Sequence, residues 1–224
     1  MQKSSIFTPM ASRSLRDSVA ELLSDALMSG RIQPGERLNE SHLARQLQVS
    51  RAPIREALQQ LQEQGLVVNQ PRRGMFVVSL DEEDLQKINS LRLVLETEAL
   101  CLAARNLNPA GERKLTQLVE KMENTQPSPA LQATRMDLEF HRTVWSLTGN
   151  EYLEKTLVSL TAPLFAYAIL TKPKNEKLRM ILDSHRPVLE FVQGKSSESA
   201  YQVMLNHLKL RWSEPSKYAS SQHA

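Results

Sequence analysis

The chain has 224 residues, of which 41% are hydrophobic and 24% are charged, so it can form one large or two modest apolar cores. It shows no apolar run long enough to span a membrane and no secretory leader, and we therefore expect a cytoplasmic protein without a membrane partner. The single cysteine, Cys101, excludes an intramolecular disulfide, and its place in the stretch EALCLAA indicates a buried, inert thiol.

The excess of basic residues lies in the first third of the chain. Residues 1–80 contain 10 Lys and Arg against 7 Asp and Glu, whereas residues 81–224 contain 18 of each kind. Nine of the ten basic residues in the first third are arginine. Because a local positive excess attracts a polyanion, this distribution indicates a nucleic-acid partner for the N-terminal part.

Three helices are predicted near the N-terminus, and the second and third of them are short and joined by a turn. Residues 1–13 are polar and without period, which indicates a loose arm, and a helix follows from Ser14 to Gly30. After a tight turn at Pro34-Gly35, the pattern predicts a short helix at Glu40–Leu47 and a second one at Arg51–Gln64. The apolar stripe of the first helix contains Leu15, Val19, Leu22, Leu23, Ala26 and Leu27.

A β-hairpin is predicted after these helices. Residues 66–68 and 75–78 are β-branched or aromatic runs, and the turn-rich segment NQPRRG separates them. Short helices joined by a tight turn and followed by a hairpin are the layout of a winged helix-turn-helix. We therefore predict such a domain over residues 14–79.

The helix at Arg51–Gln64 is the expected DNA-reading helix. Arg51 and Arg55 are four residues apart and share a face away from the apolar stripe. A recognition helix enters the major groove N-terminus first, so both arginines can reach phosphates or guanine edges. Ser50 and the first-turn N–H groups suit a phosphate oxygen. The apolar stripe contains Ile54, Ala57, Leu58 and Leu61.

The tip of the hairpin is the second expected DNA contact. Arg72 and Arg73 are placed to lie along or inside the minor groove, and Gly74 lets the backbone come close. One arginine alone would be read as an ordinary solvated charge. Four arginines on the two elements that this fold uses for DNA favour a role in binding.

From Asp81 onward the pattern is helical, with no further strand signal. Breaks leave about six helices of roughly 14 to 27 residues, which predicts an all-α bundle over residues 80–212 and a tail at 213–224. The first bundle helix has an apparent inward stripe that Arg92 interrupts. That stripe contains Ile88, Leu91, Leu95, Ala99 and Leu102.

Three histidines and one aspartate of the bundle have the spacing of metal ligands. Asp137 and His141 are four apart on one face of a helix predicted at Ala130–Leu147. His185 and His207 flank a hinge at Gly194, each roughly 14–15 Å from the turn. One carboxylate and three imidazoles suit a divalent ion such as zinc, nickel or manganese. The alternative is three unrelated histidines and a surface aspartate.

Arg92 needs a partner if it is buried. The ordinary partner is Glu96, one turn later. The functional partner would be the carboxylate of a small acid that also completes the metal's coordination shell. Candidates for lining such a cavity, which at helical spacing also fit a plain core, are Trp145, Tyr152, Phe165, Tyr167 and Met180.

The first third of the chain resembles the DNA-binding domain of the GntR family of bacterial transcription regulators. It carries PG-x-x-L-x-E-x-x-LA, then VSR-x-P-x-REAL, then GLV and RRG-x-FV. The resemblance implies DNA contacts by Ser50, Arg51, Arg55 and the wing residues Arg73 and Gly74. An arginine that some members carry just before the LA pair corresponds to Ser41 or His42 here.

The stretches MDLEFHRTVWSLTGNEYL and SHRPVLEFVQGKSSESAYQVMLNHL are similar to the effector-binding FCD domain of the FadR subfamily. That domain shows D-x-x-x-H, then H, then H, and all four positions are filled here. The resemblance implies a bundle of six or seven helices that binds a metal, with the lower helix number favoured. Its first helix carries R-x-x-x-E, whose arginine often faces the cavity, which matches Arg92.

These features predict a transcription regulator, more often a repressor in this family, that binds an inverted-repeat operator as a homodimer. A small organic acid between the metal and Arg92 would reorient the two wings about the linker Ser79–Glu83 and weaken operator binding. One alternative is a purely structural metal. A metal-dependent hydrolase is disfavoured, because no H-E-x-x-H pattern exists and Glu139 points away from the ligand face. We therefore expect no enzyme.

Overall fold

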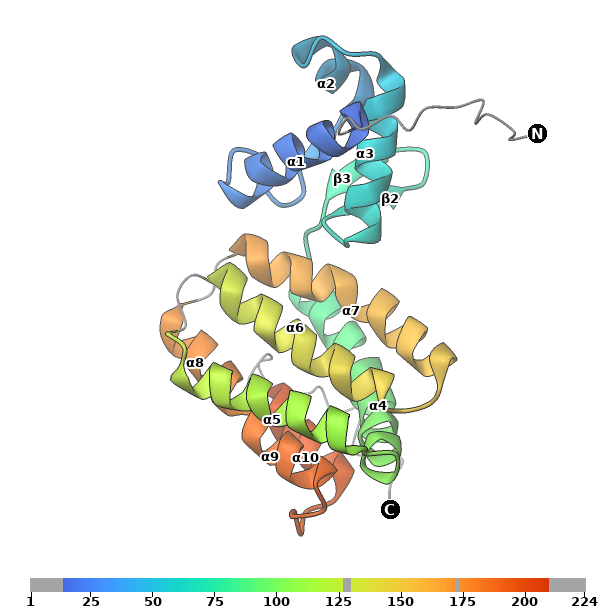
Figure 1. The fold of residues 1–224 in the computed structure, drawn as a ribbon. Coiled ribbons are helices and arrows are strands. Elements are labelled where there is room, and N and C mark those ends of the chain that lie inside the picture. The colour runs from blue at the N-terminus through green and yellow to red at the C-terminus, as the bar shows by residue number, and fades with distance from the viewer. Residues whose placement is uncertain (1–13, 127–129, 172–173, 210–224) are drawn as a thin grey trace, which may run out of the picture. The chain divides into compact units, whose positions relative to one another are not determined.

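The computed structural model describes residues 14–126, 130–171 and 174–209 (Figure 1). The arm predicted at 1–13 and the tail predicted at 213–224 lie outside the described residues. The described residues form two compact units, one within residues 14–63 and 67–77 and the other within residues 64–66, 78–126, 130–171 and 174–209.

The first unit is a winged helix-turn-helix, as predicted. Its sheet has the order β1-β3-β2 with antiparallel pairing, and Arg37 of β1 lies opposite Phe76 of β3. β1 is absent from the sequence prediction because two residues are too few to show an alternating pattern. The elements are α1 (Leu15–Met28), β1 (Arg37–Leu38), α2 (Glu40–Gln46), α3 (Arg51–Glu63), β2 (Val67–Gln70) and β3 (Gly74–Val77).

Helix α3 is the core of this unit. The four residues of its predicted apolar stripe are all 0% exposed, which confirms that prediction. The stripe predicted for α1 is partly wrong, since Leu15 and Leu22 are each 54% exposed. α1 packs mainly against α3, so a narrower stripe suffices. The residues of α1 that are buried are Val19, Ala20, Leu23 and Leu27.

The second unit is a bundle of seven helices among the described residues, where about six were expected. The additional boundary is Ser184, which separates α8 from α9 while apolar periodicity continues on both sides. The helices are α4 (Glu82–Arg105), α5 (Pro109–Asn124), α6 (Ala130–Ser146), α7 (Glu151–Thr171), α8 (Asn175–Asp183), α9 (His185–Val192) and α10 (Ala200–Lys209).

Helix α4 is the centre of the bundle. Asp81 caps it with a capping box to Asp84, and the helix then packs against α6, α7, α9 and α10 (Figure 1). The inward stripe predicted for this helix is wrong in part, because Leu91 is 48% exposed. Compared with the predicted stripe, the buried face is turned about the helix axis and includes polar residues. Arg92 is therefore part of the buried face and does not interrupt it. Its members are Asn89, Arg92, Leu93, Glu96, Ala99, Leu100 and Ala103.

Helix α7 is 21 residues long and contains an 18-residue window with a mean hydropathy of 1.3, so length and composition alone would allow it to cross a membrane. Its Leu157 and Phe165 belong to the bundle core, and 28% of that window is buried. Two proposed cavity residues are placed wrongly, since Tyr152 is 75% and Met180 is 54% exposed. Cys101 is half-buried rather than buried.

Candidate metal centre and DNA-binding surface

The residues predicted to touch DNA are all on the surface of the winged unit. Ser50 immediately precedes α3, and Arg51 and Arg55 follow in its first turns with exposed side chains. Arg55 also pairs with Glu40 at the start of α2, with Nη2 and Oε2 3.0 Å apart. This pair orients the guanidinium across the gap between the two helices.

The wing carries the other predicted contacts. Arg72 and Arg73 are exposed, and Arg72 takes a positive φ of 64° in the turn. The Arg73 guanidinium lies 5.1 Å from the centroid of the Phe76 ring, a cation–π contact. A groove of about 400 Å³ runs from the wing to the recognition helix. The residues of the hairpin that line this groove are Asn69, Gly74 and Met75.

The groove includes one arginine that the sequence analysis missed. Arg37 on β1 is exposed, and its Nη2 is 3.8 Å from the position that a Cβ on Gly74 would take. Only the pairing of β1 with β3 brings it to the wing, and β1 has no pattern of its own.

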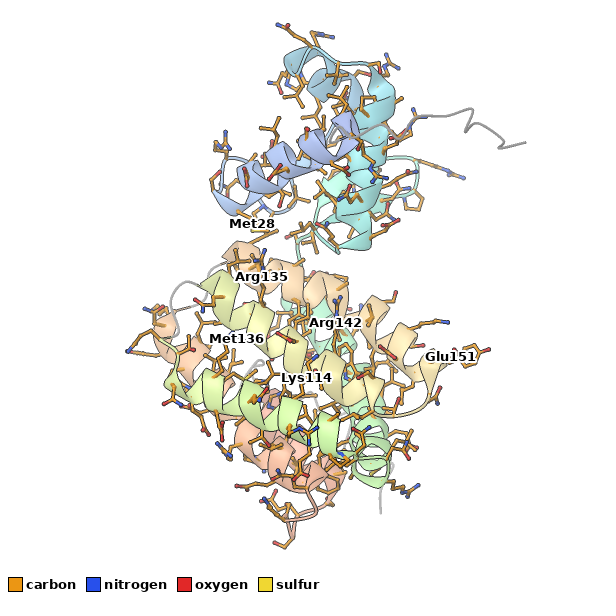
Figure 2. The ribbon with its side chains drawn as sticks, in the orientation of Figure 1. Met28, Lys114, Arg135, Met136, Arg142 and Glu151 are labelled. Carbon is orange, nitrogen blue, oxygen red and sulfur yellow. The ribbon has the colours of Figure 1, made fainter. Side chains whose placement is uncertain are left out.

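The four predicted metal ligands converge in the bundle. Asp137 and His141 come from α6, His185 begins α9, and His207 lies on α10. Their candidate ligand atoms all lie within 4.8 Å of one another, and the four residues are at most 2% exposed. The two residues of α6 lie on its buried side, opposite the exposed Arg135 and Arg142 that Figure 2 labels.

Distances within the cluster are those of groups that face a common point. His185 Nε2 is 3.0 Å from Asp137 Oδ1, and His141 Nε2 is 3.5 Å from the same oxygen. His141 Nε2 and His207 Nε2 are 3.1 Å apart. The carboxylate and all three Nε2 atoms thus share one small volume.

The other nitrogen of each imidazole has an acceptor. His185 Nδ1 donates to the carbonyl of Leu182 at 3.1 Å, and His207 Nδ1 donates to the carbonyl of Ser184 at 3.2 Å. His141 Nδ1 donates to Glu96 Oε2 at 2.7 Å. His207 Nδ1 also lies 2.8 Å from the Ser184 hydroxyl, whose own proton goes to the Ile181 carbonyl at 2.6 Å. Since the carbonyls and the carboxylate only accept and this hydroxyl already donates to Ile181, each neutral ring carries its proton on Nδ1 and directs the Nε2 lone pair inward.

This arrangement fits a divalent cation. Two Nε2 lone pairs only 3.1 Å apart repel each other unless a positive charge lies near them. The Arg92 guanidinium, 3.0 Å from His141 Nε2, is one such charge, and a divalent cation among the four donors would be a second. Acceptors behind each histidine are the usual second layer of a metal site, since they fix the ring and its tautomer. An Asp-His₃ donor set suits first-row divalent ions. These four residues could therefore hold a metal ion.

Glu96 supports the cluster and holds Arg92. Burial alone would raise the pKa of Glu96, but the Arg92 charge and the contact with His141 outweigh burial and lower it to about 2. The ionised carboxylate accepts hydrogen bonds from Arg92 Nε and, at 3.3 Å, from Trp145 Nε1. The ordinary partner expected for Arg92 is thus present.

Arg92 also touches the cluster directly. Its Nη2 is 3.0 Å from His141 Nε2, and its guanidinium lies 5.4 Å from the centroid of the Phe165 ring. Trp145 and Phe165, two of the proposed lining residues, are therefore at the site. A cavity of about 20 Å³ adjoins Asp137, between α6, α7 and α8. That volume holds about one water molecule.

Sequence comparison identifies both units. The profile described as "Bacterial regulatory proteins, gntR family" matches residues 15–77, and the profile described as "FCD domain" matches residues 87–210, more than half of the chain. The uncharacterized HTH-type transcriptional regulator YdhC of Bacillus subtilis is 31% identical over 190 residues, 83% of this chain and 84% of that protein. The gluconate operon transcriptional repressor of the same bacterium is 28% identical, over 79% of this chain and 75% of its own.

Solved structures show the same fold. Escherichia coli McbR/YncC has a TM-score of 0.66 at 24% identity and covers 89% of this chain and 96% of its own. A GntR transcriptional regulator from Rhodococcus sp. RHA1 has a TM-score of 0.61 at 22% identity, over 88% and 95% of the two chains. A winged unit and a helical unit, each matched by its profile and both shared with these relatives, place the chain in the GntR family as a DNA-binding transcription regulator with an FCD domain.

Proposed function

We propose that this regulator is a cytoplasmic repressor whose operator affinity is lowered by a small carboxylate bound beside a metal ion in the bundle. The observation that carries the proposal is the contact between Arg92 and a buried Asp-His₃ cluster. The relative named as a gluconate operon repressor supports the repressor assignment.

The DNA half of the proposal rests on the exposed arginines of the winged unit. Arg51 and Arg55 would contact the major groove with Ser50 at a phosphate, and Arg72, Arg73 and Gly74 would contact the minor groove. A homodimer would present two such units to an inverted repeat. The groove between helix and wing offers the surface for one half-site.

The metal half rests on the donor chemistry. Asp137, His141, His185 and His207 would hold zinc, nickel or manganese, and the ion would supply a Lewis-acidic partner for one oxygen of a carboxylate. Arg92 would bind the other oxygen, because a guanidinium and a carboxylate form charge-assisted hydrogen bonds. An anion at this position would also offset the repulsion between Arg92 and a nearby cation.

Coupling between the units would follow from the small size of the cavity. The cavity beside Asp137 has about 20 Å³ and is not lined by Arg92, so the helices around the cluster must separate when an acid binds between the metal and Arg92. An acid that binds the opened bundle better than the closed one shifts the population of the two states. We propose that residues 79–83 transmit this shift to the winged unit.

Elemental analysis of the purified protein tests the ligand set. The wild type should hold about one divalent ion per chain, and the double variant Asp137→Ala/His185→Ala should hold none. The exposed His42→Ala is the matched control and should retain the ion. Stoichiometric metal in the double variant would remove the assignment.

Operator binding tests the effector role. We expect carboxylates that raise the melting temperature of metal-loaded protein also to weaken its binding to an inverted-repeat duplex. Arg92→Lys preserves a charge for Glu96 but loses the planar fork, so it should bind the operator yet respond weakly to the acid. An undiminished response would return Arg92 to a purely structural role.

A purely structural metal is the second candidate, and the full burial of the cluster and the small cavity favour it. Both candidates predict a lower melting temperature after chelation. Only effector binding predicts a further increase with acids on metal-loaded protein. A hydrolase gains no support, because Glu139 is half-exposed and lies 3.8 Å from Lys114 on α5.

A further inference from the structure

The side chain of Asn89 on α4 is a fully buried amide that takes no part in the hydrogen bonds described above. Asn89 is 0% exposed, and neither its Oδ1 nor its Nδ2 has a hydrogen-bond partner among the described residues. No other residue in the described ranges has both side-chain amide atoms in this condition. Burying an amide without a partner destabilises the folded state, so its presence calls for an explanation.

The position of Asn89 relates it to the Arg92 side of the cluster. Asn89, Arg92 and Glu96 are at i, i+3 and i+7, which places them in one row on the buried face of α4. Arg92 and Glu96 both contact His141 across this face. Asn89 is the next polar group along the row, one turn or roughly 4.5 Å before Arg92.

We infer that Asn89 is a specificity-determining residue that recognises a second polar group of the effector. The inference rests on the proposed effector site between the metal and Arg92. A carboxylate held there would extend along α4 and place a hydroxyl or carbonyl oxygen, two or three carbons away, within reach of the Asn89 amide. The preferred class is therefore a small hydroxy or oxo acid.

The chemistry of the amide selects this class over two others. Nδ2 donates two hydrogen bonds and Oδ1 accepts, so a hydroxyl can satisfy both atoms and a carbonyl can satisfy the donor. An unsubstituted alkyl acid would leave the amide unpaired, as it is without ligand, so it would gain no affinity from this residue, whereas a hydroxylated acid would. A cationic amine on the effector would be repelled by Arg92 and the metal. Polar, uncharged substituents remain.

The same reasoning predicts that removing the Asn89 amide makes the acid-free protein more stable and its binding of acids less selective. Asn89→Leu replaces the amide with an apolar side chain of similar size, so it removes the cost of the unpaired group. We expect it to raise the melting temperature of the acid-free, metal-loaded chain by about 2–4 °C. Thr161→Val is the matched control, because Thr161 is equally buried but its hydroxyl already donates to the Leu157 carbonyl at 2.7 Å. It should not raise the melting temperature.

Selectivity is measured with three pairs of acids of equal carbon number on the full, metal-loaded chain. The pairs are 3-hydroxybutyrate and butyrate, malate and succinate, and gluconate and hexanoate. Wild type and Thr161→Val should bind at least one hydroxylated member about tenfold more tightly than its partner. Asn89→Leu should bring that ratio near one while its metal content, measured by elemental analysis, stays at the wild-type level.

Each outcome decides the matter. Preferential binding that survives in Asn89→Leu, or a preference of the wild type for the alkyl acids, overturns the inference and leaves the effector site standing. A lower melting temperature of Asn89→Leu also overturns it, since the amide would then already be satisfied in the acid-free protein, by bound water for example. Binding of none of the six acids to the wild type overturns the inference together with the effector part of the proposed function.

Discussion

The two units place their polar functional residues in opposite environments. In the winged unit the side chains of Arg51, Arg72 and Arg73 are exposed, and apolar residues alone form the core. In the bundle the polar cluster is itself part of the core, with Arg92 and His185 at 0% exposure. The exposed arginines of the winged unit can therefore be altered without cost to the fold, whereas the Asp-His₃ cluster and the core of the bundle share the same residues.

The strongest test of this contrast is the removal of one charge inside the bundle. Glu96→Gln keeps the shape of the side chain but leaves Arg92 as a buried charge without its carboxylate. We expect the free energy of unfolding to fall by about 3–5 kcal/mol, measured by urea denaturation of metal-free protein.

The matched control is Glu98→Gln, two residues later on the exposed side of α4. It should change stability by less than about 0.5 kcal/mol. If Glu96→Gln and Glu98→Gln lowered the free energy of unfolding by the same small amount, the buried pair of Arg92 and Glu96 would not stabilise the fold as its position suggests.

The contrast also explains what sequence reasoning could find. The core of α3 follows from apolar periodicity, because Ile54, Ala57, Leu58 and Leu61 face a single partner surface and carry no polar competitor. The buried face of α4 does not, because a hydrophobicity pattern assigns Arg92 and Asn89 to the outside. Burial of Arg92 depends on partners contributed by α6 and α7, which lie far along the chain.

The candidate metal ligands were predictable for a different reason. Asp137 and His141 share a helix face by spacing, His185 and His207 lie at matching distances from the Gly194 turn, and the resemblance to an FCD domain implied the same four residues. Their second layer was not predictable, since the carbonyls of Leu182 and Ser184 become acceptors only where α8 ends and α9 begins. Side-chain periodicity carries no information about that break. It also gives no sign that Arg37 lies near the wing, because β1 has only two residues.

Removing a charge from the winged unit should have the opposite effect to removing one from the bundle, since it should lower operator affinity and leave stability unchanged. Arg51→Ala should weaken binding to the operator by about 1–3 kcal/mol, while the melting temperature of the protein stays unchanged. Electrophoretic mobility shifts over a range of salt concentrations provide the measurement. If Arg51 contacts a phosphate, the salt dependence should also lose about one ion equivalent.

Arg135→Ala is the control for net charge, because this arginine is exposed on α6 of the bundle (Figure 2). It should leave operator affinity within twofold of wild type. Equal losses in both variants would mean that overall charge, and not the recognition helix, governs binding.

The smallest expected change in the free energy of unfolding comes from a salt bridge on the surface of the bundle. It tests whether the large effect expected for Glu96→Gln is due to burial of the ion pair or to charge alone. Arg186 Nε donates to Glu123 Oε1 at 2.8 Å, and the side chains are 38% and 35% exposed. The hydrogen bonds from Arg186 lower the pKa of Glu123, with burial opposing them. Because solvent screens such a pair, Glu123→Gln should cost about 0.5 kcal/mol at neutral pH.

The sign of the pH dependence follows from the lowered pKa. A carboxyl that ionises more easily in the folded state contributes stability above its ordinary pKa, and the contribution disappears as the pH falls through the lowered value. The unfolding free energies of wild type and Glu123→Gln should therefore differ at pH 7 and converge on acidification. A difference that persists unchanged at low pH would show that packing of the side chain, not its charge, joins α5 to α9. A cost as large as that of Glu96→Gln would show that burial does not set the strength of ion pairs in this bundle.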